Sequence, residues 1–95
     1  MITISTRVTS YKDRCELLEY FFKHSDVSLT YIANRTGIPY ATIGTYRTHP
    51  EKINNARTQR VNKLYDFLAN VIGAETYSDI DHIKKSEYYS VSYNN

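Results

Sequence analysis

The segment SLTYIANRTGIPYATIGTYR most constrains the fold, because two short helical patterns meet in it at a single glycine. The first pattern begins after Ser28, a residue type that caps helices, and stops at Gly37, which readily adopts the left-handed conformation that closes a helix. Pro39 suits the first turn of the second pattern, since the N–H that proline lacks would have no helical partner there. The spacing predicts two helices joined by a tight turn, over about 29–36 and 39–47.

Small and apolar residues recur in this segment at positions that let two helices cross. Ala33 is small enough for a close crossing, and Gly37 supplies the turn. The apolar residues expected to pack both helices onto a shared core are Ile32, Ile38, Ile43 and Tyr46. This arrangement predicts a helix-turn-helix unit.

A first helix is predicted over residues 10–24, ahead of this unit. Ser10 lies three residues before Asp13, so each side chain can bond the backbone N–H of the other. Cys15 is expected to be an ordinary small core residue, because a single cysteine forms no internal disulfide and no Cys/His cluster surrounds it. The apolar face is predicted to comprise Tyr11, Cys15, Leu17, Leu18, Phe21 and Phe22.

Two more helices are predicted after the unit. The dipeptide HP ends the third helix, because proline disfavours helical geometry in the residue before it. A polar connection, EKINN, leads to a fourth helix that begins near 55–58 and closes at Gly73. A short fifth helix over 78–84 has Ser78 and Asp81 as its capping box. Inward positions are predicted to be Val61, Leu64, Tyr65, Leu68, Val71, Ile72, Ile80 and Ile83.

The two ends of the chain differ from its helical middle. Ile2 and Ile4 alternate with polar residues, as do Tyr89, Val91 and Tyr93, so both ends fit either short β-strands or frayed tails. The predicted fold class is therefore all-α, a five-helix domain with terminal strands as an open alternative. The chain divides into an N-terminal arm, a helix-turn-helix domain, and a short helix with a tyrosine-rich tail, over 1–9, 10–73 and 74–95.

Composition and charge narrow the class of protein. Ninety-five residues suit one small domain, and an apolar content of 41% indicates a folded chain. Mean hydropathy of -0.54 without a long apolar run predicts no membrane span, and the lack of a signal-peptide pattern favours a cytoplasmic location. The net charge is only +2, yet residues 27–63 hold six basic residues against Glu51, which fits a phosphate-binding surface or a solvated face. The six are Arg35, Arg47, Lys52, Arg57, Arg60 and Lys63.

Catalytic patterns are missing from the sequence. His24, His49 and His82 are far apart, and none stands beside a plausible nucleophile. The chain has no glycine-rich phosphate loop. We therefore expect no enzymatic activity, no bound metal and no cofactor.

The quoted segment resembles the helix-turn-helix of the phage Cro and repressor proteins, the XRE-type family, and with its flanking helices the likeness spans residues 10–73. Pro39 departs from the polar capping residue that is frequent in this family. The resemblance implies a lambda-repressor-like domain whose third helix enters the major groove of double-stranded DNA. It also implies a homodimer that reads half-sites about 34 Å apart in a palindromic operator. The implied function is transcriptional repression in a phage or mobile-element switch.

Site residues follow from the same resemblance. The base-reading set carried over by position is Tyr40, Ala41, Thr42, Gly44, Thr45 and Arg47. Arg47 suits guanine O6 and N7, or a phosphate. Gly44 costs the helix about 1 kcal/mol relative to alanine, which either permits closer approach to DNA or is simply tolerated. The phosphate-binding set is Ser28, Thr30, Arg35, His49, Lys52, Arg57 and Arg60.

A second hypothesis assigns the chain a protein partner. Some small phage-type helix-turn-helix proteins bind and inhibit a host protein such as a defence nuclease, in the manner of anti-CRISPR proteins. Tyrosine is enriched at interfaces, so the tyrosines after Gly73 favour a contact surface for a partner or a second copy. They are Tyr77, Tyr88, Tyr89 and Tyr93.

Overall fold

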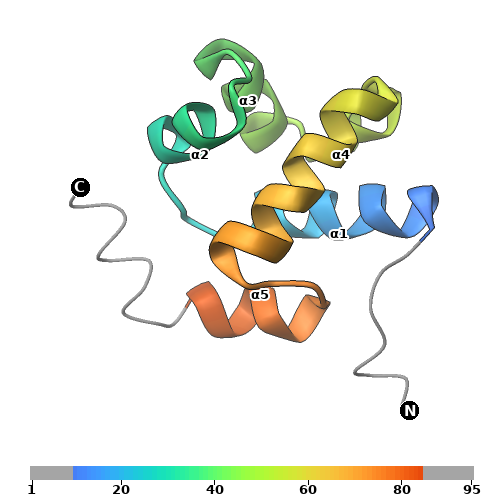
Figure 1. The fold of residues 1–95 in the computed structure, drawn as a ribbon, viewed down its shortest axis with the longest axis vertical. Helices are drawn as coiled ribbons and strands as arrows, with labels where there is room; N and C mark the ends of the chain where they lie inside the picture. Colours follow the sequence, from blue (N-terminus) through green and yellow to red (C-terminus); the bar gives the residue numbers. More distant parts are fainter. Residues whose placement is uncertain (1–9, 85–95) are drawn as a thin grey trace.

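The computed structural model describes residues 10–84, in which every regular element is a helix (Figure 1). In chain order these are α1 (Tyr11–His24), α2 (Leu29–Thr36), α3 (Tyr40–Thr48), the 3-10 helix η2 (Pro50–Asn55), α4 (Thr58–Asp66), the π-helix η3 (Phe67–Ile72) and α5 (Tyr77–Lys84). The predicted all-α class is confirmed for this part of the chain. The strands considered for Ile2, Ile4 and residues 89–93 lie outside the described residues.

Side-chain hydrogen bonds cap the first turns of α1 and α2. The Asp13 backbone N–H donates to Ser10 Oγ at 3.0 Å at the start of α1, and the Tyr31 N–H donates to Ser28 Oγ at 3.3 Å at the start of α2. Both predicted starts are confirmed. Pro39 is the residue before α3 rather than part of its first turn, with an extended ψ of 140°.

The capping box of α5 differs from the prediction. The Asp79 backbone N–H donates to Thr76 Oγ1 at 3.3 Å, and the Thr76 N–H donates back to Asp79 Oδ2 at 3.1 Å. Thr76 and Asp79 have the same three-residue spacing as the predicted pair Ser78 and Asp81. The helix therefore begins one residue earlier, at Tyr77.

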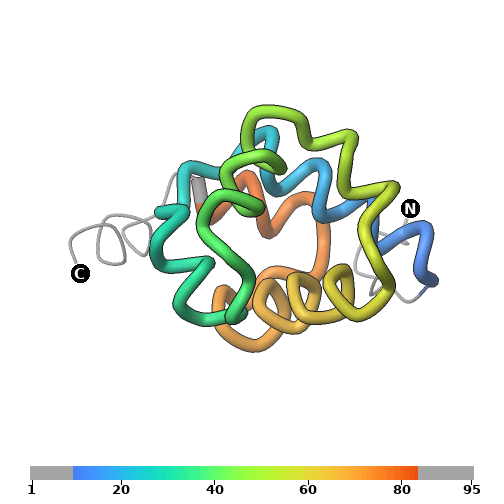
Figure 2. The backbone as a smooth tube through the Cα atoms, turned by 90° about the horizontal axis from the view of Figure 1, so that it is seen from above, coloured from blue at the N-terminus to red at the C-terminus, as the bar shows by residue number. Residues whose placement is uncertain are grey.

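Helix α1 lies at the centre of the fold and packs against α3, η2, α4 and α5. Figure 2 shows α4 and η3 as one continuous run along one side of the molecule, beside α2 and α3. No helix within residues 10–84 combines the length and apolar character needed to cross a bilayer. The buried apolar residues are Cys15, Leu17, Leu18, Phe21, Phe22, Val27, Ile32, Ile38, Ile43, Tyr46, Ile53, Val61, Leu64, Tyr65, Phe67, Leu68, Ile72, Ala74, Ile80 and Ile83.

The segment predicted to be a polar connection is the 3-10 helix η2. Ile53 is fully buried within it, and η2 packs along α1 and against α3. A single apolar residue among polar ones gives no helical period, so the sequence pattern did not indicate a core element here. The Tyr11 hydroxyl donates to the carbonyl of Ala56 at 3.1 Å, just after η2, and its ring is exposed rather than inward as predicted.

The fourth predicted helix changes its winding after Asp66. Residues Phe67–Ile72 form a π-helix that closes at Gly73, where φ is 84°. Within it Phe67, Leu68 and Ile72 are buried. Val71, predicted as inward, is half-buried and packs against the core, whereas buried Phe67 was not among the predicted inward positions.

Tyrosine rings hold α5 against α1. The Tyr20 and Tyr77 rings meet edge to face with centroids 5.1 Å apart, and the Tyr20 hydroxyl donates to the Asp81 carboxylate at 2.9 Å. That hydrogen bond is the main reason why the pKa of Tyr20 is raised. Tyr77, predicted as part of a contact surface, packs on Tyr20 and is still 40% exposed. Tyr88, Tyr89 and Tyr93 lie outside the described residues.

Gly44 lies where α3 passes the start of α2. A Cβ built at this position would have Leu29 Cδ1, at 4.0 Å, as its nearest neighbour outside the helix. The distance is an ordinary van der Waals contact, so the fold itself does not require glycine here.

Alanine at Gly44 is expected to raise the free energy of unfolding by up to about 1 kcal/mol, because it favours helix and fits beside Leu29. Urea unfolding followed by circular dichroism measures the change. A loss of stability would show that α3 and α2 approach too closely for a methyl group.

Candidate nucleic-acid interface

The α2–α3 unit is closed by its own backbone and side chains. Gly37 has a φ of 77°, and its N–H donates to the carbonyl of Ala33 at 2.9 Å. Thr36 Oγ1 donates to the carbonyl of Ile32 at 2.8 Å and accepts from the N–H of Ile38 at 3.2 Å. This turn places α3 at one end of the molecule, opposite α5 (Figure 1).

The exposed side of α3 carries short side chains. Ala41, Thr45 and Thr48 follow one another at helical spacing, and all three are exposed; we call them the outer face of α3. Thr45 Oγ1 donates to the carbonyl of Ala41, and Thr48 Oγ1 donates to that of Gly44, both at 3.1 Å. Tyr40, 56% exposed, stands at the first position of the helix.

Arg47 turns back into the protein. Its Nη2 donates to the carbonyl of Val27 at 2.7 Å, and its side chain is half-buried. Val27 is fully buried in the segment between α1 and α2. The arginine therefore joins α3 to that segment. The base-reading prediction assumed that Arg47 stands on the outer face of α3, and the structure does not place it there.

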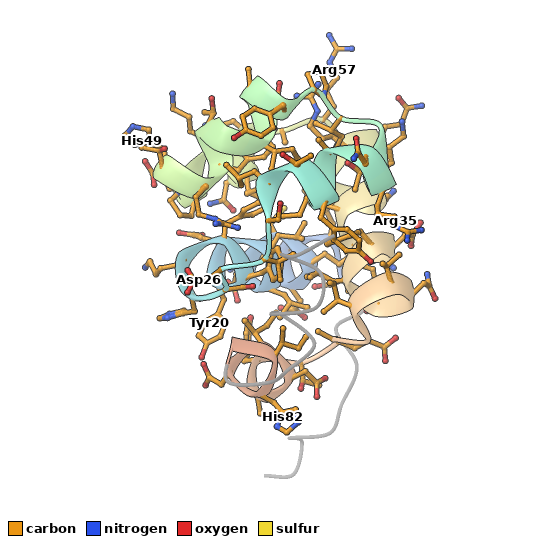
Figure 3. The ribbon with its side chains drawn as sticks, turned by 90° about the vertical axis from the view of Figure 1, so that its left-hand side faces the viewer. Tyr20, Asp26, Arg35, His49, Arg57 and His82 are labelled. Atoms are coloured by element: carbon orange, nitrogen blue, oxygen red, sulfur yellow. The ribbon has the colours of Figure 1, made fainter. Side chains whose placement is uncertain are left out.

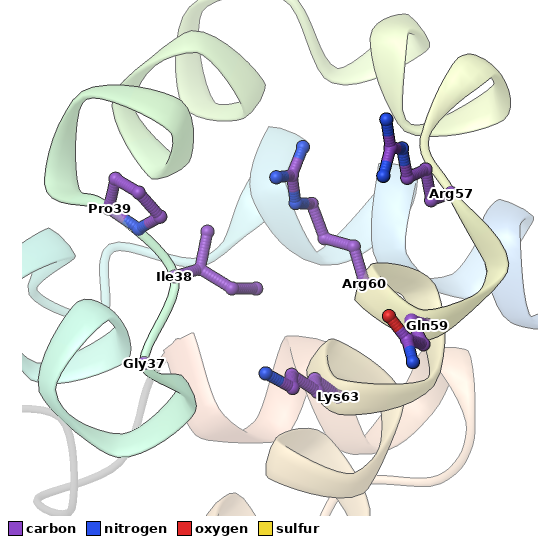
Figure 4. Close-up of a pocket in the computed structure, with 7 residues that line it drawn as sticks. All are labelled: Gly37, Ile38, Pro39, Arg57, Gln59, Arg60 and Lys63. Atoms are coloured by element: carbon purple, nitrogen blue, oxygen red, sulfur yellow. The ribbon is translucent and has the colours of Figure 1, made fainter.

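Basic side chains gather beside α3 in two hollows that meet at Arg57 and Arg60. The first hollow lies between the α2–α3 turn and α4, and Figure 4 shows Lys63 reaching from α4 toward the turn. The second lies between α3 and η2 and includes Thr42 and Lys52. We call the two together the basic groove, and its cations are Lys52, Arg57, Arg60 and Lys63.

Two helix N-termini add to the positive character of the groove. Pro39 and Arg57 precede α3 and α4, and neither supplies a side-chain cap to its helix. Helix N-termini carry partial positive charge on N–H groups without helical partners. The Arg60 guanidinium donates from Nη1 to the Tyr46 hydroxyl at 3.4 Å, which connects α4 to α3 across the groove.

The other predicted phosphate contacts do not line this groove. Arg35 lines a neighbouring hollow with Asp66, which meets the basic groove at Lys63, and its guanidinium lies 5.2 Å from the Tyr31 ring centroid. His49 Nδ1 is 3.5 Å from Glu51 Oε2. Figure 3 shows Arg57 and His49 at the α3 end of the molecule and Arg35 on its side.

At the start of α2, Ser28 is half-buried as the cap, and Thr30 is exposed. The structure therefore brings together Lys52, Arg57 and Arg60 from the predicted phosphate-binding set. It adds Lys63, which the site prediction left out. Arg57, Arg60 and Lys63 follow one another at intervals of three residues, a spacing that could have identified Lys63 as part of the same helical flank.

Two aspartates and one lysine, Lys84, stand on the helix at the other end of the molecule. Helix α5 carries Asp79 and Asp81, and it packs on α1 at the end farthest from α3 (Figure 1). His82 also lies there, far from His49 (Figure 3). Within residues 10–84, His, Cys, Asp and Glu side chains form no group of three or more that could hold a metal ion.

The features of this end that bear on binding are thus an exposed helix with short side chains and a cationic groove along its flank.

Neither the family models nor the curated proteins and solved structures compared with this chain gave a match.

Proposed function

We propose that this protein binds double-stranded DNA, with α3 in the major groove and the basic groove on the adjacent phosphates. The observation that carries the proposal is that Lys52, Arg57 and Arg60 line one hollow with Thr42 and Thr45 of α3. Lys63 continues this row beside the turn that precedes α3. Proteins that place a helix in the major groove commonly hold it there by contacts to the phosphates on either side.

The dimensions of α3 suit this role. A nine-residue helix is about 13 Å long, and the major groove, about 12 Å wide, admits an α-helix. The short side chains of the outer face, Ala41, Thr45 and Thr48, let the helix backbone come close to the base edges.

The cations of the basic groove supply the affinity in this proposal. Lys52 and Arg57 are exposed, and Arg60 is half-buried at the junction of the two hollows. Phosphate contacts of this kind release counterions, so binding weakens steeply as salt is added. The uncapped N–H groups at the start of α3 and α4 favour an anion at the same place.

We extend the proposal to a homodimer on a palindromic operator, acting in transcriptional repression. A helix as short as α3 covers few base pairs, so two copies are needed for a specific site. The regulatory role follows from the family resemblance of the helix-turn-helix segment.

The double variant Arg57→Gln/Lys63→Gln tests the proposal. Fluorescence anisotropy of a labelled mixed-sequence duplex gives the association constant between about 50 and 200 mM salt. The slope of log K against log salt is expected to become shallower by roughly 1.8, since each lost phosphate contact contributes about 0.9. Both side chains are exposed, so the fold is expected to be retained.

Lys12→Gln/Lys23→Gln is the matched control, because both lysines are exposed on α1 and the net charge changes by the same amount. The control is expected to keep the wild-type slope. Equal slopes for the two double variants would show that binding depends on overall charge and would contradict a phosphate site at the basic groove.

A further inference from the structure

We infer that α3 selects A·T base pairs through thymine methyl groups, and that it does not read guanine through a charged side chain. The inference rests on the proposed function, because it names the class of DNA sequence that the same interface would select. Two observations support it: the hydrogen bonds that Thr45 and Thr48 make on the outer face, and the side chain of Arg47, which points into the protein.

The outer face presents methyl groups. Ala41 contributes its Cβ, and Thr45 and Thr48 each contribute a Cγ2, at spacings that place the three residues in one exposed row. In the major groove the C5-methyl of thymine is the apolar group of the base edges, and alanine and threonine methyls are suited to contact it.

The hydroxyls of Thr45 and Thr48 each donate a hydrogen bond to a backbone carbonyl of α3. Thr45 Oγ1 donates to the carbonyl of Ala41 and Thr48 Oγ1 to that of Gly44, each at 3.1 Å. A hydroxyl has one proton, so each oxygen is left with lone pairs that accept hydrogen bonds. Adenine N6 and cytosine N4 both donate to such acceptors in the major groove, whereas guanine presents only the acceptors N7 and O6, so the thymine methyl is what distinguishes an A·T pair from a G·C pair. The face is thus matched to both bases of an A·T pair.

The charged side chain of α3 points away from this face. Arg47 donates from Nη2 to the carbonyl of buried Val27 at 2.7 Å, so turning it outward would break that bond inside the protein. Arginine is the side chain best suited to guanine, because its fork donates to O6 and N7 together. Within α3 no other residue carries a positive charge.

The remaining long side chains near α3 do not supply a guanine reader. The cations Lys52, Arg57 and Arg60 stand on η2, just before α4 and on α4, and they line a hollow with Thr42 and Thr45 beside the outer face. In the proposed complex the DNA backbone passes there, so these cations bind phosphates. Tyr40 is exposed at the helix start, but a phenol both donates and accepts and so does not select one base.

Selection of bound duplexes from a random library, with the full chain at about 0.15 M salt, tests the inference first. The expected motif has consecutive A·T pairs at its most constrained positions. The selected duplex is then remade with uracil in place of thymine, which removes only the C5-methyl group. Binding is expected to weaken about fourfold for each contacted methyl that is lost.

A pair of variants at one position assigns the effect to α3. Thr45→Ser removes the methyl and keeps the hydroxyl, whereas Thr45→Val keeps a methyl and removes the hydroxyl. Thr45 is exposed, so neither change disturbs the core. The uracil penalty at the base pair facing Thr45 is expected to vanish in Thr45→Ser and to persist in Thr45→Val.

A selected motif with conserved guanine at its centre, or equal binding of the thymine and uracil duplexes, would overturn the inference while leaving the proposed function intact. No enriched motif, together with equal salt slopes for the two charge variants, would reject the proposed function and the inference together.

Discussion

Replacement of Ile53 by alanine is expected to lower the free energy of unfolding by about 2–5 kcal/mol. Ile53 is fully buried, and η2, to which it belongs, packs along α1 and against α3. Truncation to alanine removes apolar contacts and leaves a cavity that surrounding helices fill only in part. Urea unfolding monitored by circular dichroism gives the change in midpoint and, with an unchanged slope, the change in stability.

The control for this experiment is Asn55→Ala, at an exposed position of the same 3-10 helix. Exposed substitutions of this kind usually change stability by no more than about 0.5 kcal/mol. If Ile53→Ala costs no more than the control, η2 is not part of the core in solution.

Alanine at Gly37 is expected to destabilise the protein by about 1–2 kcal/mol, although a Cβ there would meet no atom within 4 Å. The cost comes from the backbone alone, because φ is 77° and L-residues with a side chain rarely adopt that region. The turn between α2 and α3 depends on this conformation, because the Gly37 N–H closes α2 by donating to the carbonyl of Ala33.

Gly44→Ala provides the comparison, since it is the same chemical change in the same helix-turn-helix unit. Its expected sign is opposite: added stability, because Gly44 has ordinary helical geometry and room for a methyl. Thermal or urea unfolding of the two variants side by side measures both. Two changes of the same sign would mean that backbone conformation does not distinguish the two glycines.

The helices with strong end signals were predictable from the sequence. Ser10, Ser28, Gly37 and Gly73 each mark a helix end in the structure. Capping is local chemistry, in which one side chain bonds an N–H a few residues away or one residue adopts a left-handed conformation. Patterns of this kind need no knowledge of the tertiary fold.

Elements set by tertiary packing were not predictable in the same way. Ile53 is one apolar residue among polar neighbours, and only its position under α1 makes η2 a core element. The winding of Phe67–Ile72 departs from the α-helical period, and buried Phe67 was not among the inward positions which that period predicted.

The sequence indicated which helices form the candidate site better than it indicated where their side chains point. The sequence located α3 and the cations Lys52, Arg57 and Arg60 that the structure gathers beside it. It did not show that Arg47 bonds the carbonyl of Val27, because the segment before α2 is far from it in the sequence. Arg35 also belongs to the basic block of the sequence, but it lines a neighbouring hollow with Asp66 that meets the basic groove only at Lys63.

The opposite placement of the basic groove and acidic α5 has a kinetic consequence. Helix α5 carries two aspartates, Asp79 and Asp81, against one lysine, Lys84, so the molecule has cations at one end and a net negative helix at the other. Under the proposed function this dipole would turn the groove toward DNA before contact. A larger share of the encounters with DNA then occurs with the basic groove facing it. Added salt would limit this orienting effect of the dipole to about one Debye length. Salt would therefore change mainly the association rate constant through this effect, and less the lifetime of the complex.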